Sequence, residues 1–149
     1  MPRPSSLLLI LSTLIASWLG MQAVHELGHV IGASVSGGTV ARVVLHPLTI
    51  SRTDLETNPH PLLVVWAGPV WGVLFPLLLW GVGILGRLPG TFVLRIFAGF
   101  CLLANGLYIS MGSFDGVGDC GVMLRHGSQP WQLWLFGLVT APTGLYLWH

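Results

Sequence analysis

Four long runs of this sequence contain almost no charged side chains, and this feature limits the possible folds more than any other. The runs are residues 7–24, 62–85, 92–111 and 131–148, and Arg95 is the one charged residue within them. Each run is close to the roughly 20 residues that a helix needs to cross about 30 Å of hydrocarbon. Backbone polar groups must be satisfied inside lipid, so helices are the expected form. We therefore expect an all-α integral membrane protein with about four transmembrane helices.

The composition supports a multi-pass membrane protein. Charged residues make up 7% of the 149 residues, against about 25% in a soluble domain, and 53% are hydrophobic. So few charges cannot cover a water-facing surface, and a net charge of +1 provides no attraction for nucleic acid. The length fits one domain over residues 1–149. Its expected surroundings are a lipid bilayer, which in a bacterium would be the inner membrane.

The first run has a second interpretation. Arg3, an apolar stretch and small residues near Ala23 also fit a cleaved signal peptide. However, the apolar pattern continues through Val30, Ile31 and Val35. This continuation favours one long helix of about 28 residues.

The end of this long helix contains His25-Glu26-Leu27-Gly28-His29, which is an H-E-x-x-H pattern. Positions i and i+4 of a helix share one face, so both imidazoles can bind one metal ion. Glu26 is turned by about 100° from His25, which leaves it beside the metal and free to take a proton from water. A polar helix end is the alternative, but a Glu in an apolar helix is costly unless it is partnered or functional. We expect His25 and His29 as metal ligands and Glu26 as the general base.

A catalytic zinc ion needs a third protein ligand. Glu56 lies in a turn-rich loop and is a poor match for the Glu ligand of soluble zinc proteases. A third histidine in the extended H-E-x-x-H-x-x-G-x-x-H pattern is also missing, because Val35 occupies its position. Asp115 and Asp119 follow the third run and remain as candidates, unless both only stabilise turns. If each run crosses once, the first and third helices point the same way, and both ligand groups emerge near one leaflet.

With these residues the chain resembles the site-2 protease family of intramembrane zinc metalloproteases. The resemblance covers roughly residues 20–125. It rests on the H-E-x-x-H motif in an apolar helix, on the A-G-P element at residues 67–69, and on Asn105 followed by Asp115 and a glycine. Family members typically carry N-x-x-P-x-P-x-L-D-G there, with the Asp as the third zinc ligand. The resemblance implies that Asn105 contacts substrate or orients the site.

The chain departs from the family pattern near the third ligand. No proline lies between Asn105 and Asp115, and their spacing is two residues longer than in the family. Residues 119–124 (DCGVML) are also similar to the D-G-G-x-x-L form that the ligand Asp opens in many members. Asp115 and Asp119 therefore both stay candidates, with Asp119 favoured.

The segment between the first two runs predicts a short β-hairpin at the membrane surface. Residues 39–46 are rich in β-branched side chains, and Pro47 then allows a bend. The resemblance implies that this hairpin presents a strand edge to an unwound substrate segment. A plain surface hairpin is the alternative.

The resemblance also implies an activity. It indicates a compact zinc endopeptidase, without a PDZ domain, that hydrolyses peptide bonds of membrane-embedded proteins with a water activated by the metal. Zn²⁺ is the implied cofactor, and a transmembrane protein substrate is the implied partner. Two alternatives are a metal-binding membrane protein without peptidase activity, such as a transporter or an inactive relative, and a structural subunit without metal. Glu26 favours the enzyme, because metal binding alone does not require a Glu there.

Overall fold

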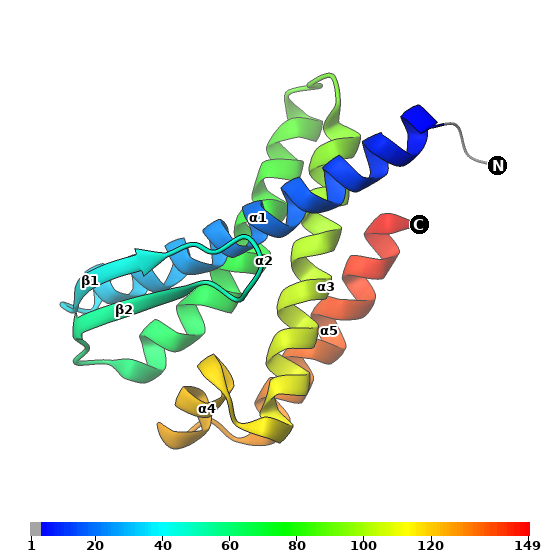
Figure 1. The fold of residues 1–149 in the computed structure, drawn as a ribbon. Coiled ribbons are helices and arrows are strands. Elements are labelled where there is room, and N and C mark those ends of the chain that lie inside the picture. Colours follow the sequence, from blue (N-terminus) through cyan, green and yellow to red (C-terminus); the bar gives the residue numbers. More distant parts are fainter. Residues whose placement is uncertain (1–3) are drawn as a thin grey trace.

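The computed structural model describes residues 4–149, which form a helical bundle with one β-hairpin (Figure 1). Its elements are α1 (Pro4–Val35), β1 (Thr39–Val44), β2 (Arg52–Thr57), α2 (Pro61–Leu85), α3 (Thr91–Asp115), α4 (Gly118–Arg125) and α5 (Pro130–Trp148). The predicted helical fold, with a hairpin between the first and second long helices, is confirmed. The short helix α4 was not predicted, because its sequence reads as a loop.

The number of candidate membrane spans differs from the prediction. Among residues 4–149, three helices are long and apolar enough to cross a membrane, namely α1, α2 and α3. The fourth run does form a helix, α5, but this helix is not among them. Its 19 residues carry no charge, yet they include Gln, Thr, Pro, Trp and Tyr side chains that lower the mean hydropathy. The prediction counted charges and therefore overlooked these uncharged polar groups.

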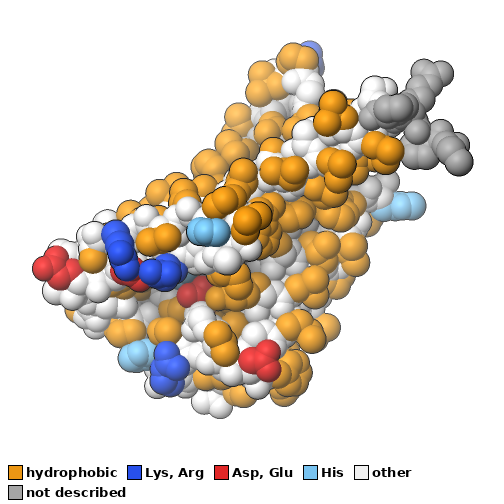
Figure 2. Space-filling view, in the orientation of Figure 1, with side chains coloured by type: hydrophobic (Ala, Val, Ile, Leu, Met, Phe, Trp, Pro, Cys, Tyr) orange, Lys and Arg blue, Asp and Glu red, His pale blue; other side chains and the backbone are white. Residues whose placement is uncertain are grey.

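Hydrophobic and charged side chains occupy different parts of the surface. Figure 2 shows hydrophobic side chains spread over the long helices, whereas most of the visible charges gather at the hairpin and α4 end. Large hydrophobic residues along α1, α2 and α5 are exposed, for example Leu8 at 70%, Leu78 at 61% and Leu138 at 72%. Such a surface is unfavourable in water and suits lipid.

The long helices pack closely because glycines line their contacts. A Cβ atom at Gly28 of α1 would lie only 2.8 Å from the Cα atom of Gly68 in α2. A Cβ atom at Gly72 of α2 would lie 2.8 Å from the amide of Asn105 in α3. Small residues let helix backbones approach in this way, which is a typical basis of helix association in membranes. With the helices this close, Asn105 of α3 reaches His25 of α1.

The direction of the helices agrees with the predicted topology. In Figure 1, α1 runs obliquely downward from the upper right to the left, α3 runs from the top to the bottom, and α2 runs back upward from the lower left. The second half of α1 and the end of α3 therefore lie toward the same end of the bundle, where α4 is also found.

The hairpin is hydrogen-bonded to α1 within the first apolar run. β1 and β2 pair antiparallel. The Trp18 indole N–H donates to the Pro47 carbonyl oxygen (2.8 Å), and the Gln22 amide donates to the carbonyl oxygen of His46 (3.1 Å). The Ser51 backbone N–H donates to Gln22 Oε1 (2.6 Å). Because Trp18 and Gln22 lie in the first apolar run, these bonds satisfy polar groups that lipid would leave unpaired.

Candidate metal centre

Two histidines of α1 and one aspartate of α4 converge on one point, although α1 and α4 are far apart in the sequence. The Nε2 atoms of His25 and His29 are 3.1 Å apart. Asp119 Oδ2 lies 2.9 Å from His25 Nε2 and 3.4 Å from His29 Nε2. All three potential ligand atoms lie within 4.8 Å of one another. Within residues 4–149, this is the one group of three or more such side chains that could hold a metal ion.

Hydrogen bonds on the far side of each ring fix the tautomers of the two histidines. His25 Nδ1–H donates to Asn105 Oδ1 (2.7 Å), and His29 Nδ1–H donates to the carbonyl oxygen of Val64 (2.9 Å). The Asn105 amide nitrogen in turn donates to the Cys101 carbonyl oxygen (2.9 Å), so its oxygen faces His25. With the protons on Nδ1, both Nε2 atoms present lone pairs toward the same point. This is the arrangement in which metal-binding histidines are usually held.

The three donor atoms fit a zinc ion. Zn–N and Zn–O bonds of about 2.0–2.1 Å in a tetrahedral site place neighbouring ligand atoms about 3.3 Å apart. The three observed separations of 2.9, 3.1 and 3.4 Å are close to that value. Two nitrogens and one carboxylate oxygen are also a donor set that zinc enzymes use, with the fourth position left for water. Without a cation or a proton between them, two lone pairs would face each other at 3.1 Å.

The ionisation of two neighbouring side chains of α4, Asp119 and Cys120, decides which of them can act as an anionic ligand. Burial opposes ionisation of the Asp119 carboxyl, but in the absence of a metal ion, hydrogen bonds from protonated His25 and His29 rings outweigh burial, so the pKa of Asp119 lies well below its ordinary value. The neighbouring Cys120 is different, because burial and the carboxylate of Asp119 raise the pKa of its thiol to about 11. Asp119 is therefore available as an anionic ligand at neutral pH, whereas Cys120 stays protonated.

The structure distinguishes between the two predicted aspartates. Asp119 belongs to the group of three donors, and Asp115 does not. Asp115 is the last residue of α3, is exposed, and lines a cleft together with Asp119 and the two histidines. Of the two candidates, the structure therefore brings Asp119 and not Asp115 within reach of both histidines.

The predicted general base, Glu26, lies beside the histidines and is held by the hairpin. Its side chain is buried, with the residue only 4% exposed. The hydroxyl of Thr53 in β2 donates to Glu26 Oε2 (2.7 Å). No sequence pattern predicts this contact, because the two residues are 27 positions apart and meet only where the hairpin packs against α1.

A cleft of about 530 Å³ opens onto these groups. Its lining includes Ser51, Arg52 and Thr53 from the hairpin side and residues of α3 and α4. Glu26 and the three potential metal ligands also line it. The potential ligands and Glu26 therefore border one shared cleft.

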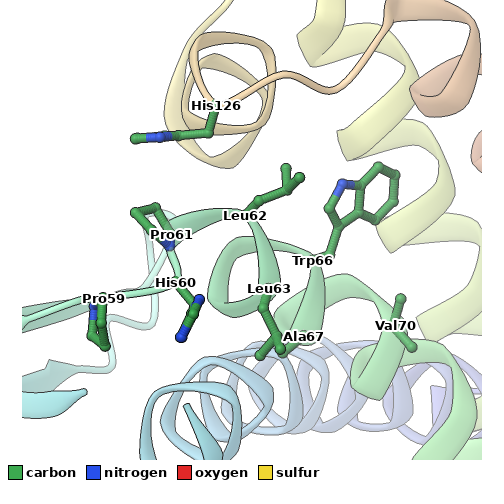
Figure 3. Close-up of a pocket in the computed structure, with 9 residues that line it drawn as sticks. All are labelled: Pro59, His60, Pro61, Leu62, Leu63, Trp66, Ala67, Val70 and His126. Atoms are coloured by element: carbon green, nitrogen blue, oxygen red, sulfur yellow. The ribbon is translucent and has the colours of Figure 1, made fainter. Parts of the chain in front are cut away.

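A second cavity, of about 740 Å³, lies on another part of the molecule (Figure 3). It is formed by the start of α2, including Leu62 and Trp66, and by His126 after α4. Its two histidines, His60 and His126, point away from each other, and none of the three potential metal ligands contributes to it. This cavity offers no comparable set of donors.

Three comparisons with known proteins identified no relative of this chain. No family model, no curated protein and no solved structure matches this chain.

Proposed function

We propose that this chain is an intramembrane zinc metalloprotease of the site-2 protease type. The observation that carries the proposal is the convergence of His25, His29 and Asp119 beside a buried glutamate, Glu26, in a bundle with an apolar surface. A metal store or a transporter has no need of the glutamate, whereas hydrolysis does.

The proposed roles follow from the contacts. His25, His29 and Asp119 hold the metal, and the acceptors behind the two rings keep their Nε2 atoms directed at it. Bound zinc supplies Lewis acidity, which makes hydroxide accessible near neutral pH and polarises a carbonyl group. Glu26 takes a proton from the attacking water and later delivers it to the leaving amine. The hydrogen bond from Thr53 orients the carboxylate of Glu26 for that transfer.

The expected substrate is a membrane-embedded protein segment. Backbone groups of a helix are hydrogen-bonded internally, so a helix must unwind locally before its peptide bond can be attacked. Segments with Gly, Pro or polar residues near the cut unwind most easily. The cleft beside β2 is lined by the exposed Arg52 and by Ser51 and Thr53, which suits an extended and partly polar chain better than a closed helix.

Substitution of the glutamate tests this proposal. The purified protein in detergent is loaded with zinc and incubated with synthetic apolar peptides of about 20 residues, which is the length of a membrane span, each with a central Gly-Pro or Asn-Gly pair. We expect cleavage by the wild type and a loss of about 10²–10⁴-fold in Glu26→Gln, with zinc content unchanged. Glu56→Gln is the matched control, because Glu56 is the other Glu of the chain and is exposed on the hairpin.

The outcomes separate the candidate functions. Equal activity of Glu26→Gln and wild type would remove Glu26 from the mechanism. A wild-type protein that binds one zinc ion but cleaves none of the peptides would favour a metal-binding membrane protein without peptidase activity. A protein that binds no zinc at all would refute the metal centre.

A further inference from the structure

Tyr108 lies at the site but has no role in the scheme above. It follows Asn105 by three residues on α3, so both side chains point toward α1. Its ring packs edge-to-face against His25, with 5.9 Å between the ring centroids and 75° between the planes. Tyr108 lines the cleft of about 530 Å³ at the candidate metal centre and also a smaller cavity of about 110 Å³. His25 and Glu26 line both of them as well. The side chain therefore borders the space that a substrate would enter.

The phenol group of Tyr108 has a hydrogen-bond donor to spare. Its oxygen accepts a hydrogen bond from the Asp119 backbone N–H (3.2 Å). A tyrosine hydroxyl can donate one hydrogen bond as well as accept. Within residues 4–149, no acceptor for that proton is found, since the Asp119 amide is the one hydrogen-bond partner of the hydroxyl. The proton is thus free for a ligand in the cleft.

The start of α4 is shaped around this hydroxyl. Gly118 adopts a left-handed conformation (φ 61°), and a Cβ atom at this position would overlap the Tyr108 oxygen. Glycine therefore serves two purposes here, because it permits the positive φ and leaves room for the phenol. As a result the hydroxyl sits directly beside the third potential metal ligand, Asp119.

We propose that Tyr108 is a catalytic residue whose hydroxyl donates a hydrogen bond to the carbonyl oxygen of the scissile peptide bond. This inference rests on the proposed protease function. In peptide hydrolysis the carbonyl oxygen gains negative charge as water adds to the carbon, and a fixed donor aimed at that oxygen stabilises the transition state. The phenol proton stays on the tyrosine oxygen throughout, so no covalent change at Tyr108 is required. Its hydrogen bond from the Asp119 amide makes the hydroxyl a better donor, because hydrogen bonds in a chain polarise one another.

A purely structural role predicts a different behaviour. If the hydroxyl served only to hold the Asp119 amide, its loss would loosen Asp119 and weaken metal binding. If it contacts the transition state, its loss lowers kcat while the metal stays bound. Removal of an interaction that is made only in the transition state lowers kcat and kcat/KM equally and leaves KM unchanged.

The variant Tyr108→Phe tests the proposal, because it removes the hydroxyl and keeps the ring against His25. Wild type, Tyr108→Phe and Tyr146→Phe are compared in detergent with saturating zinc and the synthetic apolar peptide that the wild type cleaves best. Tyr146 is the other Tyr of the chain and is 78% exposed on α5, so it is a matched control. We expect kcat to fall about 100-fold in Tyr108→Phe, with KM, zinc content and zinc affinity unchanged. Tyr146→Phe is expected to behave like wild type.

Two results would overturn the assignment of Tyr108 alone. One is a Tyr108→Phe variant with the kcat of wild type. The other is a loss of activity that follows a loss of zinc affinity and is restored by excess zinc, which would make Tyr108 a positioning residue for Asp119. A wild-type protein that cleaves none of the peptides would instead overturn the proposed function, and the role of Tyr108 with it.

Discussion

Replacement of Asn105 by leucine tests whether His25 is held as a metal ligand. Asn105 is 1% exposed, and its oxygen accepts the Nδ1–H of His25 at 2.7 Å. Leucine has a similar volume, so it fills the space and leaves no room for a water molecule to replace the acceptor. The variant therefore removes the hydrogen bond with His25 and the hydrogen bond that the Asn105 amide donates to the Cys101 carbonyl oxygen within α3. Only the first of these contacts involves a potential metal ligand.

We expect Asn105→Leu to destabilise the metal-bound state more than the metal-free state. When Nε2 of His25 binds a metal, the proton of the imidazole ring must be on Nδ1, and a leucine at position 105 offers no acceptor for it. Without metal the ring can shift its proton to Nε2 and donate to Asp119, which lies 2.9 Å away. A buried donor without a partner costs about 1–3 kcal/mol. At 1.4 kcal/mol for each factor of ten, zinc affinity should fall about 5- to 150-fold. Mutation of the hydrogen-bond partner of a metal-binding side chain typically lowers metal affinity about 10- to 100-fold, which is in the same range.

Zinc affinity in detergent can be measured by competition with a chromophoric chelator. The control is Asn58→Leu, because Asn58 is the other Asn of the chain and its side-chain oxygen has no hydrogen-bond partner within residues 4–149. Thermal melts followed by circular dichroism show whether each variant is folded. A folded Asn105→Leu protein that binds zinc as tightly as wild type would refute the assignment of His25 as a ligand held through Nδ1.

Three further experiments, each based on substitutions, test the neighbouring contacts. In Gly68→Ala the new methyl group would overlap the ring of His29, so we expect elemental analysis to find less than one zinc per chain while the helical circular dichroism is retained. Asp119→Asn is expected to lose both zinc and peptide cleavage, whereas the exposed Asp115→Asn should keep both, and equal losses in the two would contradict the donor set. Thr53→Val removes the hydroxyl that orients the proposed general base and should lower kcat about tenfold at unchanged zinc content. Thr53→Ser should restore the rate, and failure to do so would show that the methyl group rather than the hydroxyl matters.

The parts of the site that lie within one helix could be predicted from the sequence. Four residues cover about 400° of an α-helix, so His25 and His29 share a face wherever that helix lies in the fold. The same rule places Glu26 beside them. The long helices were also predictable, because an apolar run of this length has few other ways to satisfy its backbone.

Contacts between distant segments could not be predicted in this way. Thr53 meets Glu26 only because the hairpin tip is held against Trp18 and Gln22, and those hydrogen bonds depend on the length and twist of both strands. Tyr108 lies in an apolar run, and it meets Asp119 only because the chain reverses direction between α3 and α4. No residue spacing in the sequence predicts either contact.

The choice between the two aspartates shows where spacing fails. Asn105 contacts His25, and Asp115 is ten residues further along the same helix, which carries it about 15 Å along the axis and away from the histidines. Two glycines in left-handed conformations, Gly116 (φ 62°) and Gly118 (φ 61°), then end α3 and turn the chain back into α4. This reversal brings Asp119, the more distant residue in the sequence, to His25 and His29. The spacing between Asn105 and the aspartate therefore does not decide which aspartate meets the histidines, because the turn after α3 takes up the additional residues.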